Sequence, residues 1–193
     1  MLAYLLFFRI RVWGVERVPR QGGFILASNH ASFLDPPAVG VALARQVRFF
    51  ARRSLFDVPL VGRLIASWRA VPISRGASDI AAIRQAVDVL RRGQGIVLFP
   101  EGTRSNDGRV GEFRPGFVAV AARARVPIVP VAVHGAFAAW PRTRRLPRAG
   151  RIHVAYGEPI APPTGGKADY LAVARHTREC VVALKEGLEL NKD

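Results

Sequence analysis

The chain contains very little cysteine and no long apolar run. It has 193 residues and a single cysteine, Cys180. One thiol excludes an internal disulfide and offers no cysteine-based zinc site, so we expect a reducing compartment. The apolar run at residues 2–8 is far shorter than the about 20 apolar residues that cross a bilayer. We therefore expect no transmembrane span, and the order of residues does not predict a signal peptide.

Acidic residues and lysine are also scarce, so the charge is strongly positive and carried by arginine. The sequence has 29 Lys and Arg against 14 Asp and Glu, a formal net charge of +15, and only three of the basic residues are lysines. Such a surface attracts polyanions. Nucleic acid, an anionic membrane leaflet and a phosphorylated substrate all fit, and charge alone does not choose between them.

Short apolar runs alternate with helix-like segments, which favours an α/β sheet. The predicted strands are residues 24–27, 48–51, 71–73, 96–99, 128–133 and 152–155. The predicted helices are residues 78–92, capped by Ser78, and 170–190. Pro127 and Pro130 favour an edge or irregular strand at 126–133. Residues 141–151 carry five arginines and two prolines and predict an exposed basic loop. We expect one domain over 1–193, with a mixed, mostly parallel sheet flanked by helices and an interfacial segment at 1–13.

The most informative segment places His30 directly after the strand at 24–27, with Asp35 five residues later and Pro36 and Pro37 following. In a continuous helix, residues five apart point about 140° away from each other. The prolines predict a turn instead, with Asp35 as the cap of a helix that begins at Pro36. A carboxylate that holds one imidazole nitrogen leaves the other basic, and no serine nucleophile motif accompanies the pair. Such a dyad can act as a general base on a hydroxyl of the substrate.

Two further segments end strands in polar turns. Residues 100–105 follow the strand at 96–99 and include Glu101, Gly102, Thr103 and Arg104. Gly102 lets a ligand approach the backbone, and Arg104 offers a planar fork suited to phosphate oxygens. Arg75 follows the strand at 71–73. Strand ends in an open α/β sheet meet along one crevice, which predicts that these groups lie together.

These residues resemble the signatures of the glycerolipid acyltransferases, the family that includes lysophosphatidic acid acyltransferase. Asn29-His30 with Ser32 and Asp35 resembles the first signature, and residues 99–105 (Phe-Pro-Glu-Gly-Thr-Arg-Ser) resemble the third. Arg75 falls where the second signature has its arginine, and residues 129–131 resemble the fourth. Residues 14–19 are similar to the approach to the first signature. The likeness extends from about residue 12 to about residue 159.

The resemblance implies transfer of a fatty acyl group from an acyl thioester to the free hydroxyl of 1-acyl-glycerol-3-phosphate, giving phosphatidic acid. It implies that His30 is the base, that Asp35 orients it, and that Arg75 and Arg104 hold the phosphate. The substrate-binding residues implied by position are Asn29, Ser32, Arg75, Glu101, Gly102, Thr103 and Arg104. Arg52 stands where the family usually has lysine. Many members also carry apolar helices ahead of the first signature, and this chain has almost none.

The resemblance implies no cofactor and no metal site, with acyl-CoA or acyl-carrier protein as co-substrate. Expected partners are the lysophospholipid, the acyl thioester, the acyl carrier protein and an anionic membrane surface. We expect the chain to bind the cytoplasmic face of that membrane peripherally, without a transmembrane span. The alternatives left open are another lysolipid acceptor in the same family, a basic nucleic-acid-binding protein, and a hydrolase in which water replaces the alcohol. Aromatics make up only 9% of the residues and do not interleave with the arginines, so nucleic acid is not expected as a partner.

Overall fold

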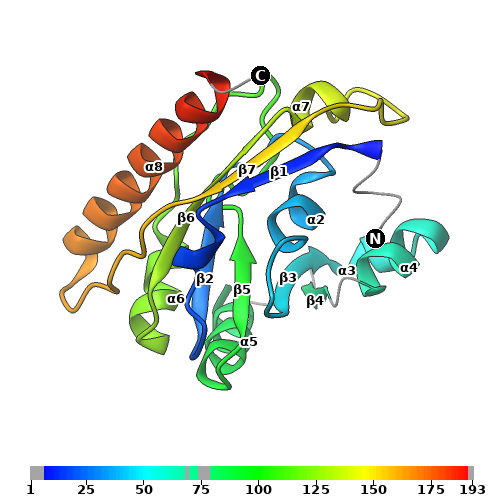
Figure 1. Cartoon of the computed structure of the whole chain (residues 1–193). Helices are drawn as coiled ribbons and strands as arrows, with labels where there is room; N and C mark the ends of the chain where they lie inside the picture. The colour runs from blue at the N-terminus through cyan, green and yellow to red at the C-terminus, as the bar shows by residue number, and fades with distance from the viewer. Residues whose placement is uncertain (1–6, 68–69, 74–78, 191–193) are drawn as a thin grey trace.

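A seven-stranded sheet forms the centre of the part of the chain that the structure, a computed structural model, describes (Figure 1). The described residues are 7–67, 70–73 and 79–190. The strand order is β1-β7-β6-β2-β5-β3-β4. The strands are β1 (Ile10–Trp13), β2 (Phe24–Ser28), β3 (Val47–Arg52), β4 (Val71–Ile73), β5 (Gly95–Leu98), β6 (Ile128–His134) and β7 (Ile152–Tyr156). β6, β2, β5, β3 and β4 are parallel to one another, whereas β7 is antiparallel to β6 and β1 is parallel to β7.

Helices cover both faces of the sheet. They are η1 (Val15–Arg17), α2 (Asp35–Gly40), α3 (Arg53–Phe56), α4 (Pro59–Ser67), α5 (Asp79–Arg91), α6 (Gly116–Ala124), α7 (Ala136–Ala139) and α8 (Lys167–Leu190). On one face, α5, α6 and α8 bury apolar side chains against β2, β5 and β6. On the other face, α2 and α7 pack against alternate residues of the same strands. Because strand side chains alternate between faces, strands buried on both sides read as continuous apolar runs.

The predicted mixed, mostly parallel α/β architecture is confirmed. All six predicted strands are present within one residue at each end, and the two predicted helices are α5 and α8. Ser78, the expected cap of the first of these helices, lies outside the described residues. None of the helices in the described part of the chain has both the length and the apolar character that a bilayer crossing requires.

The prediction of an edge or irregular strand at 126–133 is wrong, because β6 lies inside the sheet between β7 and β2. Pro127 precedes the strand and contributes only its carbonyl, which accepts a hydrogen bond from the Ile25 amide. The Pro130 carbonyl accepts from Gly157, just past the end of β7. Pro130 has no N–H to donate, and the residue opposite it, Gly157, lies beyond the end of β7. A sheet tolerates proline at such a position, because the hydrogen-bonded ladder ends there.

The interfacial segment expected at 1–13 stays a prediction, and the structure shows that its last residues form a strand. Ile10–Trp13 form β1, an edge strand that pairs with β7 from Ile10 opposite Ile152 to Trp13 opposite Ala155. Phe8 packs into the core beneath this edge, whereas Phe7 is half exposed. Residues 1–6 lie outside the described residues.

Candidate functional site

The site lies where β2, β5 and β6 end side by side. Ala27 pairs with Leu98 of β5 and with Pro130 of β6, so the residues after these strands meet at the same edge of the sheet. His30 follows β2, and Phe99, Pro100 and Glu101 follow β5. This is the carboxyl edge, where ligand sites of open parallel sheets occur.

His30 and Asp35 are in direct contact. The His30 Nδ1 atom lies 3.0 Å from Asp35 Oδ2. Asp35 is 1% exposed, whereas the His30 side chain is 19% exposed. Nδ1 is directed to the carboxylate, and a carboxylate in this position favours the tautomer with the proton on Nδ1, which leaves Nε2 as the ring nitrogen that can accept a proton.

Asp35 is held by the turn that precedes it, and its expected position as a helix cap is wrong. Helix α2 begins at Asp35 itself, and its carboxylate makes no capping bond to the following turn. Instead Oδ2 accepts hydrogen bonds from the backbone amides of Ala31 and Ser32, each 2.7 Å long. These bonds close residues 31–35 into a turn, so local backbone contacts bring the carboxylate to the imidazole.

Glu101 is buried and holds the backbone of the histidine. Its Oε1 accepts a hydrogen bond of 2.9 Å from the His30 amide, and its carboxylate also accepts one from the amide of Gly111. Burial raises the pKa of this carboxyl above its usual range, and the two amides act in the opposite direction. The His30 ring stacks on Phe99, with ring centroids 4.1 Å apart. Glu101 and Phe99 therefore hold both the main chain and the ring of His30.

Asn29 and Ser32 are buried, and their polar groups are bonded to the protein; their contact with substrate stays a prediction. The Asn29 side chain bonds both the amide and the carbonyl of Val133, at 2.8 and 3.0 Å. It thereby extends the pairing of β2 with β6 beyond the last residue of β2. The Ser32 hydroxyl donates to the Trp140 carbonyl at 2.7 Å and accepts from the Leu34 amide. Both residues support the turn that carries His30.

Gly102, Thr103 and Arg104 lie in the turn after β5, where Gly102 and Thr103 are exposed. Gly102 has φ of 74°, a backbone conformation that glycine adopts without strain. The Arg104 guanidinium carbon lies 3.6 Å from the centroid of the Phe33 ring. The guanidinium of Arg114 lies beside the same turn: a Cβ atom added to Gly102 would be 3.5 Å from the Arg114 guanidinium. Two guanidinium groups therefore flank this turn.

The sequence prediction missed Arg114, Phe33 and Trp140. Nothing in the local sequence marks them, because Arg114 follows an ordinary loop and the aromatics come from segments more than 100 residues apart. Phe33 and Trp140 contact each other with ring centroids 5.1 Å apart. Arg75, the expected second phosphate ligand, lies outside the described residues. No group of three or more His, Cys, Asp or Glu in the described part of the chain could hold a metal ion.

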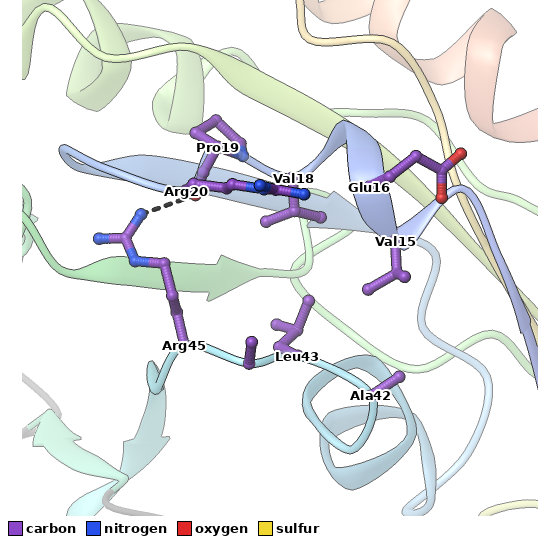
Figure 2. A pocket seen from close by; sticks show the side chains of 9 residues that line it. Val15, Glu16, Val18, Pro19, Arg20, Ala42, Leu43 and Arg45 are labelled. Atoms are coloured by element: carbon purple, nitrogen blue, oxygen red, sulfur yellow. Dashed lines mark hydrogen bonds between the residues drawn. The ribbon is translucent and has the colours of Figure 1, made fainter.

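A pocket of about 510 Å³ lies away from this site. It is bounded by the segment after β1 and the segment after α2, and none of the residues predicted for the site lines it. Figure 2 shows Val18 and Leu43 on its two sides and Arg45 bonded to the Pro19 carbonyl. Because β1 runs opposite to β2, the end of β1 lies at the amino edge of the parallel strands, opposite His30.

The described part of the chain is a three-layer α/β fold with a histidine held by a buried carboxylate at the carboxyl edge of the sheet. The chain belongs to the Acyltransferase family, whose model matches residues 9–134. The family assignment made from the signatures at His30 and Glu101 is thereby confirmed.

Relatives of known name agree with this assignment. The chain is 31% identical to the chloroplastic 1-acyl-sn-glycerol-3-phosphate acyltransferase LPAT1 of Arabidopsis thaliana over 86% of this chain and 46% of that protein. It is 26% identical to the 1-acyl-sn-glycerol-3-phosphate acyltransferase of Bacillus subtilis over 93% of this chain and 84% of that protein. The crystal structure of the 1-acyl-sn-glycerophosphate acyltransferase PlsC from Thermotoga maritima matches with a TM-score of 0.82 and 28% identity, over 96% of this chain and 74% of that one. The chain spans about half the length of the plant relative.

Proposed function

We propose that this chain transfers a fatty acyl group from an acyl thioester to the free hydroxyl of 1-acyl-glycerol-3-phosphate, giving phosphatidic acid. The observation that carries the proposal is the 3.0 Å contact between His30 Nδ1 and Asp35 Oδ2, in which the histidine side chain is 19% exposed and the carboxylate 1%. The family and the names of the relatives support the acceptor.

The proposed reaction uses Nε2 of His30 as the base. As the acceptor oxygen bonds to the thioester carbonyl carbon, Nε2 takes the hydroxyl proton and Asp35 stabilises the imidazolium that forms. The carbon–sulfur bond then breaks, and His30 returns the proton to the thiolate. Two neighbouring serine hydroxyls have other partners: Ser32 donates to Trp140, and Ser105 donates to Asp107. In this proposal the attacking oxygen comes from the substrate.

The positive charge beside the dyad supports a phosphate-bearing acceptor. Arg104 and Arg114 flank the Gly102 turn, and a guanidinium binds phosphate oxygens with two parallel hydrogen bonds. We propose Arg104 as the phosphate ligand within the described residues, with Arg75 as its partner. Gly102 and Thr103 form the exposed wall on which the acceptor would rest.

The proposed setting is the cytoplasmic face of an anionic membrane, to which the chain binds peripherally. The net charge of +15 favours such a surface, and the acceptor is itself a lipid. The donor is acyl-CoA or an acyl thioester on acyl carrier protein. No cofactor enters the proposed reaction, because the dyad and the thioester supply all the groups it needs.

The test uses the purified chain with an acyl-CoA or an acyl-carrier-protein thioester and a panel of lysolipids, with the products identified by mass. His30→Ala should lower kcat by about 10² to 10⁴, the usual contribution of a general base, whereas His176→Ala on the exposed face of α8 should leave it unchanged. Arg104→Ala should raise KM for the phosphate-bearing acceptor about tenfold to a hundredfold. Formation of no product with any acceptor would refute the enzyme assignment, and unchanged acceptor affinity in Arg104→Ala would refute the phosphate role.

A further inference from the structure

The connection between α7 and β7, residues 141–151, lies against the segment that carries the histidine; we name it the arginine loop. The Ser32 hydroxyl bonds the Trp140 carbonyl at 2.7 Å, and Ser32 forms an isolated antiparallel bridge with Pro141. Arg142 at the start of the loop also contacts Asn106, in the turn after β5, at 3.5 Å. The arginine loop therefore adjoins both segments of the proposed active site.

The arginine loop concentrates positive charge without acidic neighbours in the sequence. It holds five arginines in eleven residues: Arg142, Arg144, Arg145, Arg148 and Arg151. No Asp or Glu occurs between Glu112 and Glu158. Four of the five arginines are exposed, and the fifth, Arg144, is partly covered. A surface of this kind is complementary to anionic lipid headgroups.

Apolar side chains stand among these charges. Leu146, in the middle of the arginine loop, is 74% exposed, and Phe33 beside the loop is 40% exposed. Phe33 contacts both Trp140 and the guanidinium of Arg104. Segments that lie in a bilayer interface typically combine leucine and aromatic side chains with neighbouring arginines. The apolar side chains enter the headgroup region, and the guanidinium groups stay with the lipid phosphates.

The arginine loop lies on the same side of the molecule as the proposed active site. The loop lies at the carboxyl edge of β6, the same edge as His30, whereas α5 and α6 end at the opposite edge (Figure 1). We propose that the arginine loop, with Phe33, is the surface by which the chain docks on an anionic membrane, so that the dyad faces the lipid. This inference rests on the proposed function, since a lysolipid acceptor is drawn from the membrane itself.

The experiment measures binding of the full chain to vesicles of phosphatidylcholine with and without phosphatidylglycerol, in the absence of acyl donor. The loop variant is Arg145→Glu, Leu146→Ser, Arg148→Glu, which changes exposed side chains and leaves the turn around His30 intact. The matched control is Arg92→Glu, Leu171→Ser, Arg123→Glu, which changes the same charge and one exposed leucine away from the site. Unaltered thermal melting of both variants serves as the folding control.

We expect the unmodified chain to bind the anionic vesicles, the loop variant to bind them at least about tenfold more weakly, and the control to lose much less. No vesicle binding by the unmodified chain, or equal losses in loop and control variants, would overturn the docking surface. Activity on a water-soluble, short-chain acceptor separates the two proposals. If the loop variant keeps that activity while it loses vesicle binding, the docking surface is supported. If the unmodified chain binds vesicles but acylates no acceptor, the proposed function is refuted and the docking surface is not.

Discussion

Asp35→Asn is the substitution that separates the proposed chemistry from folding. Asp35 Oδ2 accepts three hydrogen bonds, from His30 Nδ1 and from the amides of Ala31 and Ser32. The oxygen of an asparagine amide can accept the same three bonds, so the turn is kept. What is lost is the negative charge that stabilises the imidazolium while His30 holds the proton.

The size of this loss follows from Coulomb's law. With Nδ1 and Oδ2 3.0 Å apart, the centres of the two charges are about 4 Å apart, which at an effective dielectric of about 20 corresponds to about 4 kcal/mol. We therefore expect kcat to fall by about 10³. The new buried NH₂ group replaces Oδ1, which makes no hydrogen bond within the described part of the chain. It should cost about 1–2 kcal/mol of stability.

The assay is steady-state acyl transfer, with urea unfolding on the same preparations. Asp35→Ala is the contrasting variant: it leaves the Ala31 and Ser32 amides without their acceptor, so we expect about 2–5 kcal/mol of lost stability in addition to lost activity. If Asp35→Asn is folded and retains kcat within about tenfold, then the carboxylate charge does not support the base, and the reasoning for the dyad is refuted.

Two further predictions concern stability. Asn29→Ala removes both bonds to the Val133 backbone and leaves buried groups unpaired, so the free energy of unfolding should fall by about 2–4 kcal/mol. The exposed Asn106→Ala should change it by less than about 0.5 kcal/mol, and a similar loss in both would contradict the argument. His153 is 3% exposed, and burial, followed by the charge of Arg11, lowers its pKa below 6.5. Its folded state thus binds fewer protons than the unfolded chain, so stability is full above pH 6.5 and falls as the pH drops from there toward the lower folded pKa. His153→Phe should reduce the drop in Tm between neutral and mildly acidic buffer, and an unaltered drop would exclude His153 as its source.

Local sequence was enough for the α/β class and for the pair at the centre of the site. Apolar runs predicted six strands, because strands buried on both faces need apolar side chains at every position. His30 and Asp35 could be paired from sequence because they are five residues apart and a proline-bounded turn joins them. The error in the cap of α2 was a local one: the carboxylate of Asp35 bonds the amides before it, and the sequence does not show in which direction a side chain turns.

The sequence by itself determined the α/β class, the order of the polar turns and the residues of the dyad, since each depends on contacts within a few positions. Only the tertiary structure placed β6 inside the sheet, joined Glu101 to the amide of His30 and Asn29 to Val133, and set the arginine loop beside Ser32. These contacts link segments 71 to 109 residues apart. Buried donors and acceptors need hydrogen-bond partners, and in a packed sheet these partners come from segments distant in the sequence. A local sequence pattern does not predict which distant group will be the partner.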